Sequence, residues 1–128
     1  MSLPPLACVA LACVLGCGRP PRAATAHLVV LRPTAGDIWT EGESYTIRWR
    51  ATGIARVNLG LALGGKDKGH AALDLPASAD SLRWRVPQGF VSGFGLDRSD
   101  DARVRVEDAR DPTRFADSPS FTIAAPGR

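Results

Sequence analysis

The chain has 128 residues, which is enough for one domain, and its 45% hydrophobic and 23% charged content is that of an ordinary globular protein. Sixteen basic and 13 acidic residues leave a formal net charge of +3, too small for the total charge to indicate nucleic-acid binding. A chain of this length buries about two-thirds of its unfolded surface, so it can form a core without disulfides or metal.

Residues 6–15 form a short apolar run near the N-terminus. A run of about ten residues is too short to span a bilayer, which takes about 20. It ends in VLGC (14–17), which closes the run with small residues, as in a secretory signal, and resembles a bacterial lipobox. We therefore predict a lipoprotein-type signal peptide over residues 1–16, although no Lys or Arg precedes the run. The alternative is a buried helix or strand of the domain.

Lipidation of Cys17 follows from that prediction. Cleavage would remove Cys8 and Cys13, so the folded domain would hold no disulfide and no thiolate metal site. Lipid on Cys17 anchors a chain to the membrane without spanning it. Residues 17–26 are then a lipidated cysteine and a flexible linker. The expected location is across the inner membrane and anchored to the cell envelope, at the outer membrane because Gly18 is not acidic.

The remaining chain predicts an all-β domain over residues 27–124, with residues 125–128 as a tail. Apolar and polar residues alternate in several short segments, the pattern of half-buried strands. The expected strands lie at residues 27–31, 45–50, 57–63, 71–75, 82–86, 103–106 and 121–123. Ile38 and Trp39 are expected to tuck under the first strand. Residues 64–70 are expected to form a loop tip, 88–101 an irregular connection and 111–119 a turn-rich segment. About seven strands and no credible helix predict an immunoglobulin-like β-sandwich.

One stretch carries a family resemblance, the spacing Gly-x-x-Trp-x-x-Gly-x-x-Tyr-x-Ile-x-Trp at residues 36–49. With SLRWRVPQG, ARVRVEDARDP and SPSFTI it resembles the N-terminal immunoglobulin-like domain of the yeast cell-wall synthesis and Ser/Thr-rich GPI-anchored membrane proteins (the Knh-like domain). The resemblance covers about residues 29–123 and implies the same sandwich fold. It supplies turns and core aromatics, with no catalytic residue, and implies a surface protein associated with glycans.

Six arginines occupy the outward positions of the predicted strands. In an immunoglobulin-like topology YTIRW and LRWRV are neighbours, so the solvent face that they share would gather four of the six, namely Arg48, Arg50, Arg83 and Arg85. Like charges on adjacent strands repel, and guanidinium groups bind oxyanions. These four arginines therefore predict a docking face for an acidic polysaccharide, lipopolysaccharide phosphate or an acidic partner. The alternative is an ordinary solvated face, with Glu41, Glu43 and Asp74 pairing some of the arginines.

The other candidate sites are weaker. Carboxylates at 97–101 and 107–111 could start a calcium site, but neither has EF-hand spacing and both contain arginines, so we predict no metal and no cofactor. The two histidines lie by the linker and in a glycine-rich loop, away from any nucleophile, so we predict no enzyme. Trp49 and Trp84 have inward parity and should pack in the core. Trp39, at a corner, is the tryptophan expected to be partly exposed and able to contact a sugar.

Together these observations predict a lipid-anchored binding or structural module of the cell surface. The expected partners are the membrane, through lipid on Cys17, and an acidic surface polysaccharide, with no nucleic acid. The alternative is an accessory subunit that docks on another envelope protein through a free sheet edge or the arginine face.

Overall fold

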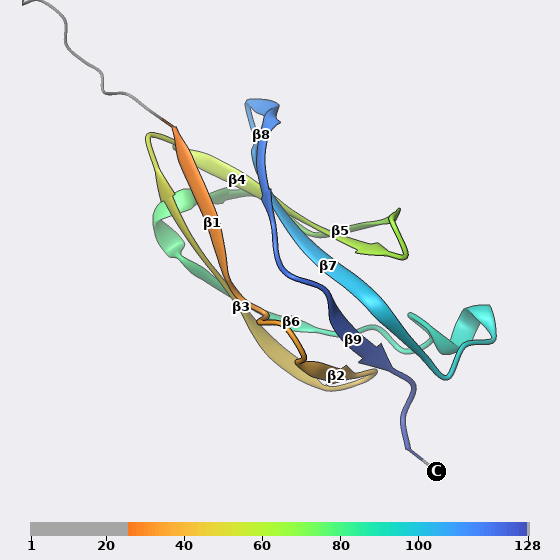
Figure 1. The fold of residues 1–128 in the computed structure, drawn as a ribbon. Helices are drawn as coiled ribbons and strands as arrows, with labels where there is room; N and C mark the ends of the chain where they lie inside the picture. Colours follow the sequence, from red (N-terminus) through yellow and green to blue (C-terminus); the bar gives the residue numbers. More distant parts are fainter. Residues whose placement is uncertain (1–25, 128) are drawn as a thin grey trace, which may run out of the picture.

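The structure, a computed structural model, describes residues 26–127. The predicted signal peptide, Cys17 and nearly all of the linker lie outside the described residues. The described part is an immunoglobulin-like β-sandwich of two packed sheets, which confirms the predicted fold class (Figure 1). Its strands are β1 (His27–Arg32), β2 (Ile38–Thr40), β3 (Ser44–Thr52), β4 (Arg56–Leu63), β5 (Lys66–Pro76), β6 (Ser81–Arg85), β7 (Arg98–Asp108), β8 (Asp111–Asp117) and β9 (Phe121–Ala124).

Helical structure is limited, within residues 26–127, to two 3₁₀ turns, η2 (Ala77–Ala79) and η3 (Ser92–Phe94). Neither turn is long or apolar enough to cross a membrane.

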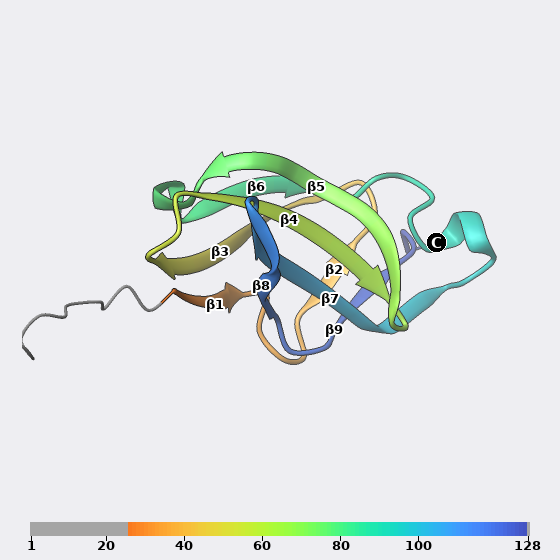
Figure 2. The same ribbon diagram turned by 90° about the horizontal axis from the view of Figure 1, so that it is seen from above.

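The smaller sheet has the order β1-β3-β6, and the larger has the order β2-β9-β7-β4-β5, with β8 also paired to β7. Seen from above, β4 and β5 run side by side as a long curved hairpin (Figure 2). All pairings are antiparallel except that of β2 with β9.

Nine strand segments occupy seven strand positions. β1 and β2 divide the first position, because the chain leaves the smaller sheet after Arg32 and joins β9 of the larger one. β8 and β9 divide the last position, since both pair with β7 along its length. The expectation of about seven strands therefore describes the positions, and breaks in the first and last strands give the two extra segments.

Four local predictions are wrong, one of them only in its bounds: the irregular connection expected over residues 88–101 ends before β7, which begins at Arg98. Residues 64–70 are not a loop tip, because β5 already begins at Lys66 and the turn is Gly64-Gly65, with φ of 57° and 83°. A two-residue hairpin turn with positive φ at both positions needs so little chain that the strands close directly on it. Residues 111–117 form β8 although none of these residues is buried, so the sequence has no apolar alternation that would predict this strand. Ile38 does not tuck under β1, since β2 lies beside β9 and leaves Ile38 58% exposed.

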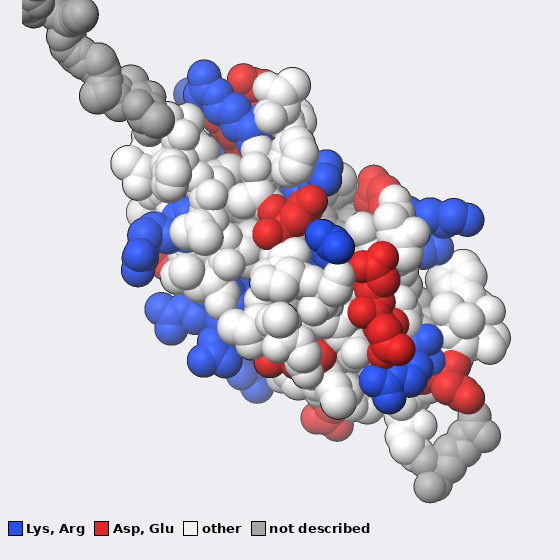
Figure 3. Space-filling model, in the orientation of Figure 1, with Lys and Arg blue, Asp and Glu red and all other residues white. Residues whose placement is uncertain are grey.

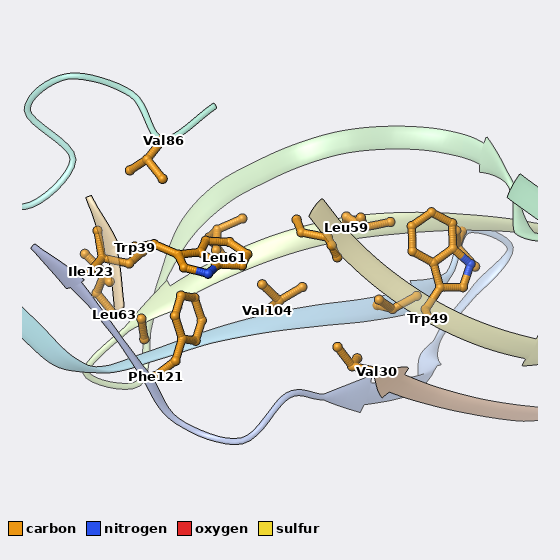
Figure 4. Packing of buried hydrophobic residues seen from close by; sticks show 14 of the residues in the cluster. Val30, Trp39, Trp49, Leu59, Leu61, Leu63, Val86, Val104, Phe121 and Ile123 are labelled. Atoms are coloured by element: carbon orange, nitrogen blue, oxygen red, sulfur yellow. The ribbon is translucent and has the colours of Figure 1, made fainter. Parts of the chain in front are cut away.

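The core lies between the sheets, where inward residues of both meet (Figure 4). Ile47 and Trp49 of β3 are 0% and 1% exposed, and the Trp49 indole Nε1 donates a 3.0 Å hydrogen bond to the carbonyl oxygen of Ala77. Leu59 of β4 and Val104 of β7 face them from the larger sheet, both fully buried. Because β3 and β6 turn their apolar residues inward, their arginines must face solvent.

Candidate anion-binding face

Strand pairing brings the four predicted arginines to one face. β3 pairs with β6 in a register that sets Thr46 opposite Arg83 and Ser44 opposite Arg85, which confirms that these strands are neighbours. Arg48 and Arg50 continue the outward positions of β3, and all four arginines are exposed. The other two arginines of the sequence pattern, Arg103 and Arg105, lie on β7 in the larger sheet.

A fifth arginine joins them through a β-bulge. The register of β1 on β3 pairs Val30 with Trp49 and then Arg32 with Arg48, so Leu31 is an extra residue. Without the bulge, Arg32 would share the inward parity of Val30; with it, Arg32 is exposed opposite Arg48. Sequence reasoning missed Arg32 because alternation cannot reveal a bulge. We call Arg32, Arg48, Arg50, Arg83 and Arg85 the arginine face.

The arginines of the two sheets differ in their pairing with carboxylates. Within residues 26–127, no Asp or Glu oxygen lies within 4.0 Å of any guanidinium of the arginine face. In the larger sheet, by contrast, five arginines each have a carboxylate partner: Arg56, Arg98, Arg103, Arg105 and Arg114. Figure 3 shows this contrast, with basic atoms in a row along the edge where β3 and β6 lie in Figure 1, and basic and acidic atoms intermixed over β7.

The expected neutralisation of this face does not occur. Asp74 pairs with Arg56 of β4, with 2.7 Å between Oδ1 and Nε, and not with the arginine face. Glu41 is 3% exposed and its carboxylate accepts hydrogen bonds from the backbone N–H groups of Gly89, Val91 and Ser92. Glu43 has no basic partner within 4.0 Å among the described residues. The pairing proposed for the solvated-face alternative is therefore wrong for these four arginines.

A hollow of about 580 Å³ opens on the arginine face. Most of its exposed lining is polar. Its lining residues are Arg32, Asp37, Ile38, Trp39, Ser44, Tyr45, Thr46, Arg48 and Arg83. The carboxylate of Asp37 already accepts two hydrogen bonds from Thr34, from the backbone N–H at 3.0 Å and from the hydroxyl at 2.9 Å.

Trp39 is not the partly exposed tryptophan that the sequence predicts. It is 4% exposed, and its ring stacks on Tyr45 at 4.8 Å between centroids, with Phe121 at 4.7 Å on another side. The pairing of β2 with β9 carries the ring inward, so its flat face is already occupied and cannot stack on a sugar. Trp49 is a core residue as predicted, and Trp84 is half-buried, packing edge-on against Phe90.

The acidic clusters are used within the fold. A hydrogen bond from the Thr122 hydroxyl and another from Arg98 lower the pKa of Asp100, and bonds from Ser120 and Arg103 do the same for Asp101. Asp108 accepts a hydrogen bond from the Arg110 backbone N–H at 2.9 Å. No group of three or more His, Cys, Asp or Glu side chains in residues 26–127 is placed to hold a metal ion.

A second hollow, of about 370 Å³, lies on the outer face of the larger sheet over Gly60 and Ala62. Two arginines line it, and both have carboxylate partners. Arg103 pairs with Asp101 at 3.4 Å, and the Arg105 guanidinium donates hydrogen bonds of 2.7 and 3.0 Å to the two oxygens of Asp117. The hydrogen bond to Asp117 raises the pKa of Arg105, and the guanidinium also lies 3.8 Å from the centre of the Phe115 ring. This hollow therefore offers an incoming anion no unpaired arginine comparable to those of the arginine face.

Comparison with known proteins adds little to this geometry. No family model and no curated protein matches the chain. Among solved structures it is similar to the fibronectin(III)-like modules of Clostridium thermocellum CbhA, with 9% identity over 77% of this chain and 94% of that one and a TM-score of 0.44. It is also similar to an engineered protein, with 17% identity over 80% of this chain but only 20% of that one and a TM-score of 0.44. Neither similarity carries an argument about function.

Proposed function

We propose that this protein is a binding module of the cell envelope that docks an anionic polysaccharide through the arginine face. The observation that carries the proposal is the contrast between the sheets: five exposed arginines without a carboxylate partner on one, five paired arginines on the other. A guanidinium presents a planar fork of donors that matches the oxygens of a carboxylate or phosphate group.

The free face is electrostatically costly without a ligand. Arg32 and Arg48 are register partners on adjacent strands, and like charges placed directly opposite destabilise a sheet. A bound polyanion would replace that repulsion with several charge-assisted hydrogen bonds. Because the contacts are exposed, the attraction would be screened at high ionic strength.

Anchoring is the second part of the proposal. The VLGC sequence at residues 14–17 supports lipidation of Cys17 and attachment to the envelope, at the outer membrane. The resemblance to the Knh-like domain, also part of the proposal, agrees with a surface role near glycans. Cells that express the protein should yield a detergent-phase form with the mass of an acylated Cys17, and Cys17→Ser should move the protein to the aqueous phase.

A pull-down from envelopes of the source organism tests the binding role. The wild-type protein should retain the polysaccharide fraction at low salt and release it at high salt. A variant with Arg48, Arg50, Arg83 and Arg85 changed to Gln should retain little at either. Equal retention by the variant and the wild type would refute the role of this face.

Two exposed apolar side chains favour a second candidate, an accessory subunit that docks on an envelope protein. Phe94 and Leu96 are 62% and 45% exposed in the connection between β6 and β7, and the Lys68 Nζ lies 4.0 Å from the centre of the Phe94 ring. A stoichiometric protein that is retained at high salt and lost with Phe94→Ser would support this candidate over polysaccharide binding.

A further inference from the structure

The hollow on the arginine face receives one arginine from each strand of the smaller sheet. Arg32 comes from β1, Arg48 from β3 and Arg83 from β6, and all three line the hollow. Arg48 sits opposite Arg32 on one side and opposite Ser81 on the other, so Arg83, two residues from Ser81, is its diagonal neighbour. Diagonal partners on adjacent strands lie about 7–8 Å apart at their Cα atoms, within reach of long side chains.

The remaining arginines of the face do not share this hollow. Arg50 of β3 and Arg85 of β6 are exposed but do not line the hollow. The lining also holds the hydroxyl side chains of Ser44 and Thr46, which can donate to an oxyanion. Three arginines and two residues with hydroxyl side chains thus line one hollow of this face.

The bulge at Leu31 strengthens this reading. A β-bulge interrupts a ladder and is commonly found where a side chain must be re-aimed. Here it turns Arg32 outward, directly opposite another arginine, although that arrangement is repulsive in the free protein. A ligand with several anionic oxygens would convert the repulsion into bridging contacts.

We infer that the hollow is a subsite for a phosphate group carried by the anionic polysaccharide, an inference that rests on the proposed function and narrows its ligand. A phosphate monoester offers three terminal oxygens and up to two negative charges, against two oxygens and one charge for a uronic acid. Three guanidinium forks that line one hollow can serve three oxygens and two charges better than they can serve the two oxygens and one charge of a uronic acid. The phosphate-bearing sugar, rather than evenly spaced carboxylates, fixes the register of the polymer on the sheet.

Asp37 limits the charge of this subsite. Its carboxylate lines the hollow, although it already accepts two hydrogen bonds from Thr34. Asp37→Asn keeps an oxygen for the Thr34 N–H and removes the negative charge, so it should tighten phosphate binding about two- to threefold.

Calorimetric titration of the purified protein with three matched sugars tests the subsite. Glucose 6-phosphate should bind most tightly, glucose 6-sulfate next and glucuronate most weakly, since the sulfate shares the single charge of glucuronate but has three terminal oxygens. Arg32→Gln should weaken binding of glucose 6-phosphate about tenfold or more, because it removes a charge-assisted contact. Arg85→Gln removes the same charge from the same face outside the hollow and should change the affinity less than about twofold.

The possible results separate the two proposals. If glucuronate binds as tightly as glucose 6-sulfate, or if Arg85→Gln costs as much as Arg32→Gln, the phosphate subsite is refuted, while docking of a polyanion on the whole face still stands. If the sugars rank as expected but envelope polysaccharide is not retained, the subsite holds and its natural source is not the polysaccharide. Thermal unfolding of each variant, compared with the wild type, shows whether a loss of binding reflects a loss of folding.

Discussion

Glu41 is the residue whose role differs most from its expected one. Its carboxylate accepts hydrogen bonds from the backbone N–H groups of Val91 and Ser92 at 2.7 Å, from that of Gly89 at 2.9 Å and from the Ser92 hydroxyl at 2.8 Å. A turn between β2 and β3 thereby fixes the irregular connection between β6 and β7. The partners lie 48–51 residues away in the chain, so no local pattern could reveal them.

Glu41→Gln should lower the free energy of unfolding by about 2–4 kcal/mol. In the wild type, several backbone N–H groups donate to the two oxygens of the Glu41 carboxylate. In Glu41→Gln one of these oxygens becomes an NH₂ group, which is itself a donor, so buried backbone N–H groups lose their acceptor. Urea denaturation at pH 7 measures the change. Glu43→Gln, at an exposed position two residues away without a carboxylate–arginine pair, is the matched control and should change stability by less than about 0.5 kcal/mol.

The same carboxylate predicts a pH dependence. Burial would by itself raise the pKa of Glu41, but the hydrogen bonds from Ser92, Val91 and Gly89 outweigh it and lower the pKa to about 2, from an ordinary 4.5. A lowered folded-state pKa stabilises the fold fully above about pH 4.5, and the contribution is lost as the pH falls toward 2. The difference in unfolding free energy between wild type and Glu41→Gln should therefore shrink between pH 5 and about pH 2.5. A constant difference over this range would contradict the role assigned to Glu41.

At the scale of the strands, side-chain alternation explains what could be predicted. Ile47 and Trp49 alternate with Arg48 and Arg50, so β3 and the composition of its outer face follow from the sequence alone. β8 could not be predicted in this way, because none of its side chains is buried and backbone pairing to β7 alone defines it. The bulge at Leu31 could not be predicted either, because register depends on how two strands pair and cannot be read from the sequence of one strand.

The edge strand β5 contains a comparable irregularity at Asp74, which adopts a positive φ of 56°. The Arg56 guanidinium Nε donates a hydrogen bond to Asp74 Oδ1 at 2.7 Å, and the backbone N–H of Asp74 donates one to Asn58 Oδ1 at 2.8 Å. Such a kink in an edge strand hinders pairing with another chain. The kink also places Asp74, which is not a glycine, in the left-handed region of backbone conformation. The hydrogen bonds of Asp74 with Arg56 and Asn58 must stabilise this conformation.

Asp74→Ala should lower the free energy of unfolding by about 1–2 kcal/mol, because alanine has neither the ion pair nor the tolerance of aspartate for this backbone conformation. Asp74→Gly loses the same ion pair but accepts the positive φ, so it should cost less than Asp74→Ala. Thermal unfolding of the two variants side by side distinguishes backbone strain from the ion pair. If glycine costs as much as alanine, strain at Asp74 makes no contribution.

At the scale of the whole molecule, the arginines of the two outer faces differ in whether a carboxylate of the fold pairs with them. Those of the larger sheet are paired within the fold, as Arg105 is with Asp117, whereas those of the smaller sheet are available to a ligand. The sequence predicted four of the five unpaired arginines, because their parity is regular on β3 and β6. It did not predict that they lack partners, since pairing depends on which strands the sandwich places nearby.

This difference predicts opposite effects on stability. Arg48→Gln relieves cross-strand repulsion and should leave the free energy of unfolding unchanged or raise it by up to about 0.5 kcal/mol. Arg105→Gln, on the other face, removes a bidentate ion pair and should lower it by about 0.5–1 kcal/mol. Urea denaturation at low salt measures both, and raising the salt should diminish both effects. A clear loss of stability in Arg48→Gln would mean that this arginine has a structural partner.

The most direct test of the account is to map an anionic polysaccharide onto the protein by NMR. Isotope-labelled protein titrated with a short phosphorylated oligosaccharide should show its largest shifts in β1, β3 and β6, led by the side-chain Nε–H signals of Arg32, Arg48 and Arg83. High salt should reverse these shifts. Shifts centred on β4, β7 and β8, or none at all, would contradict the assignment of the arginine face as the binding surface.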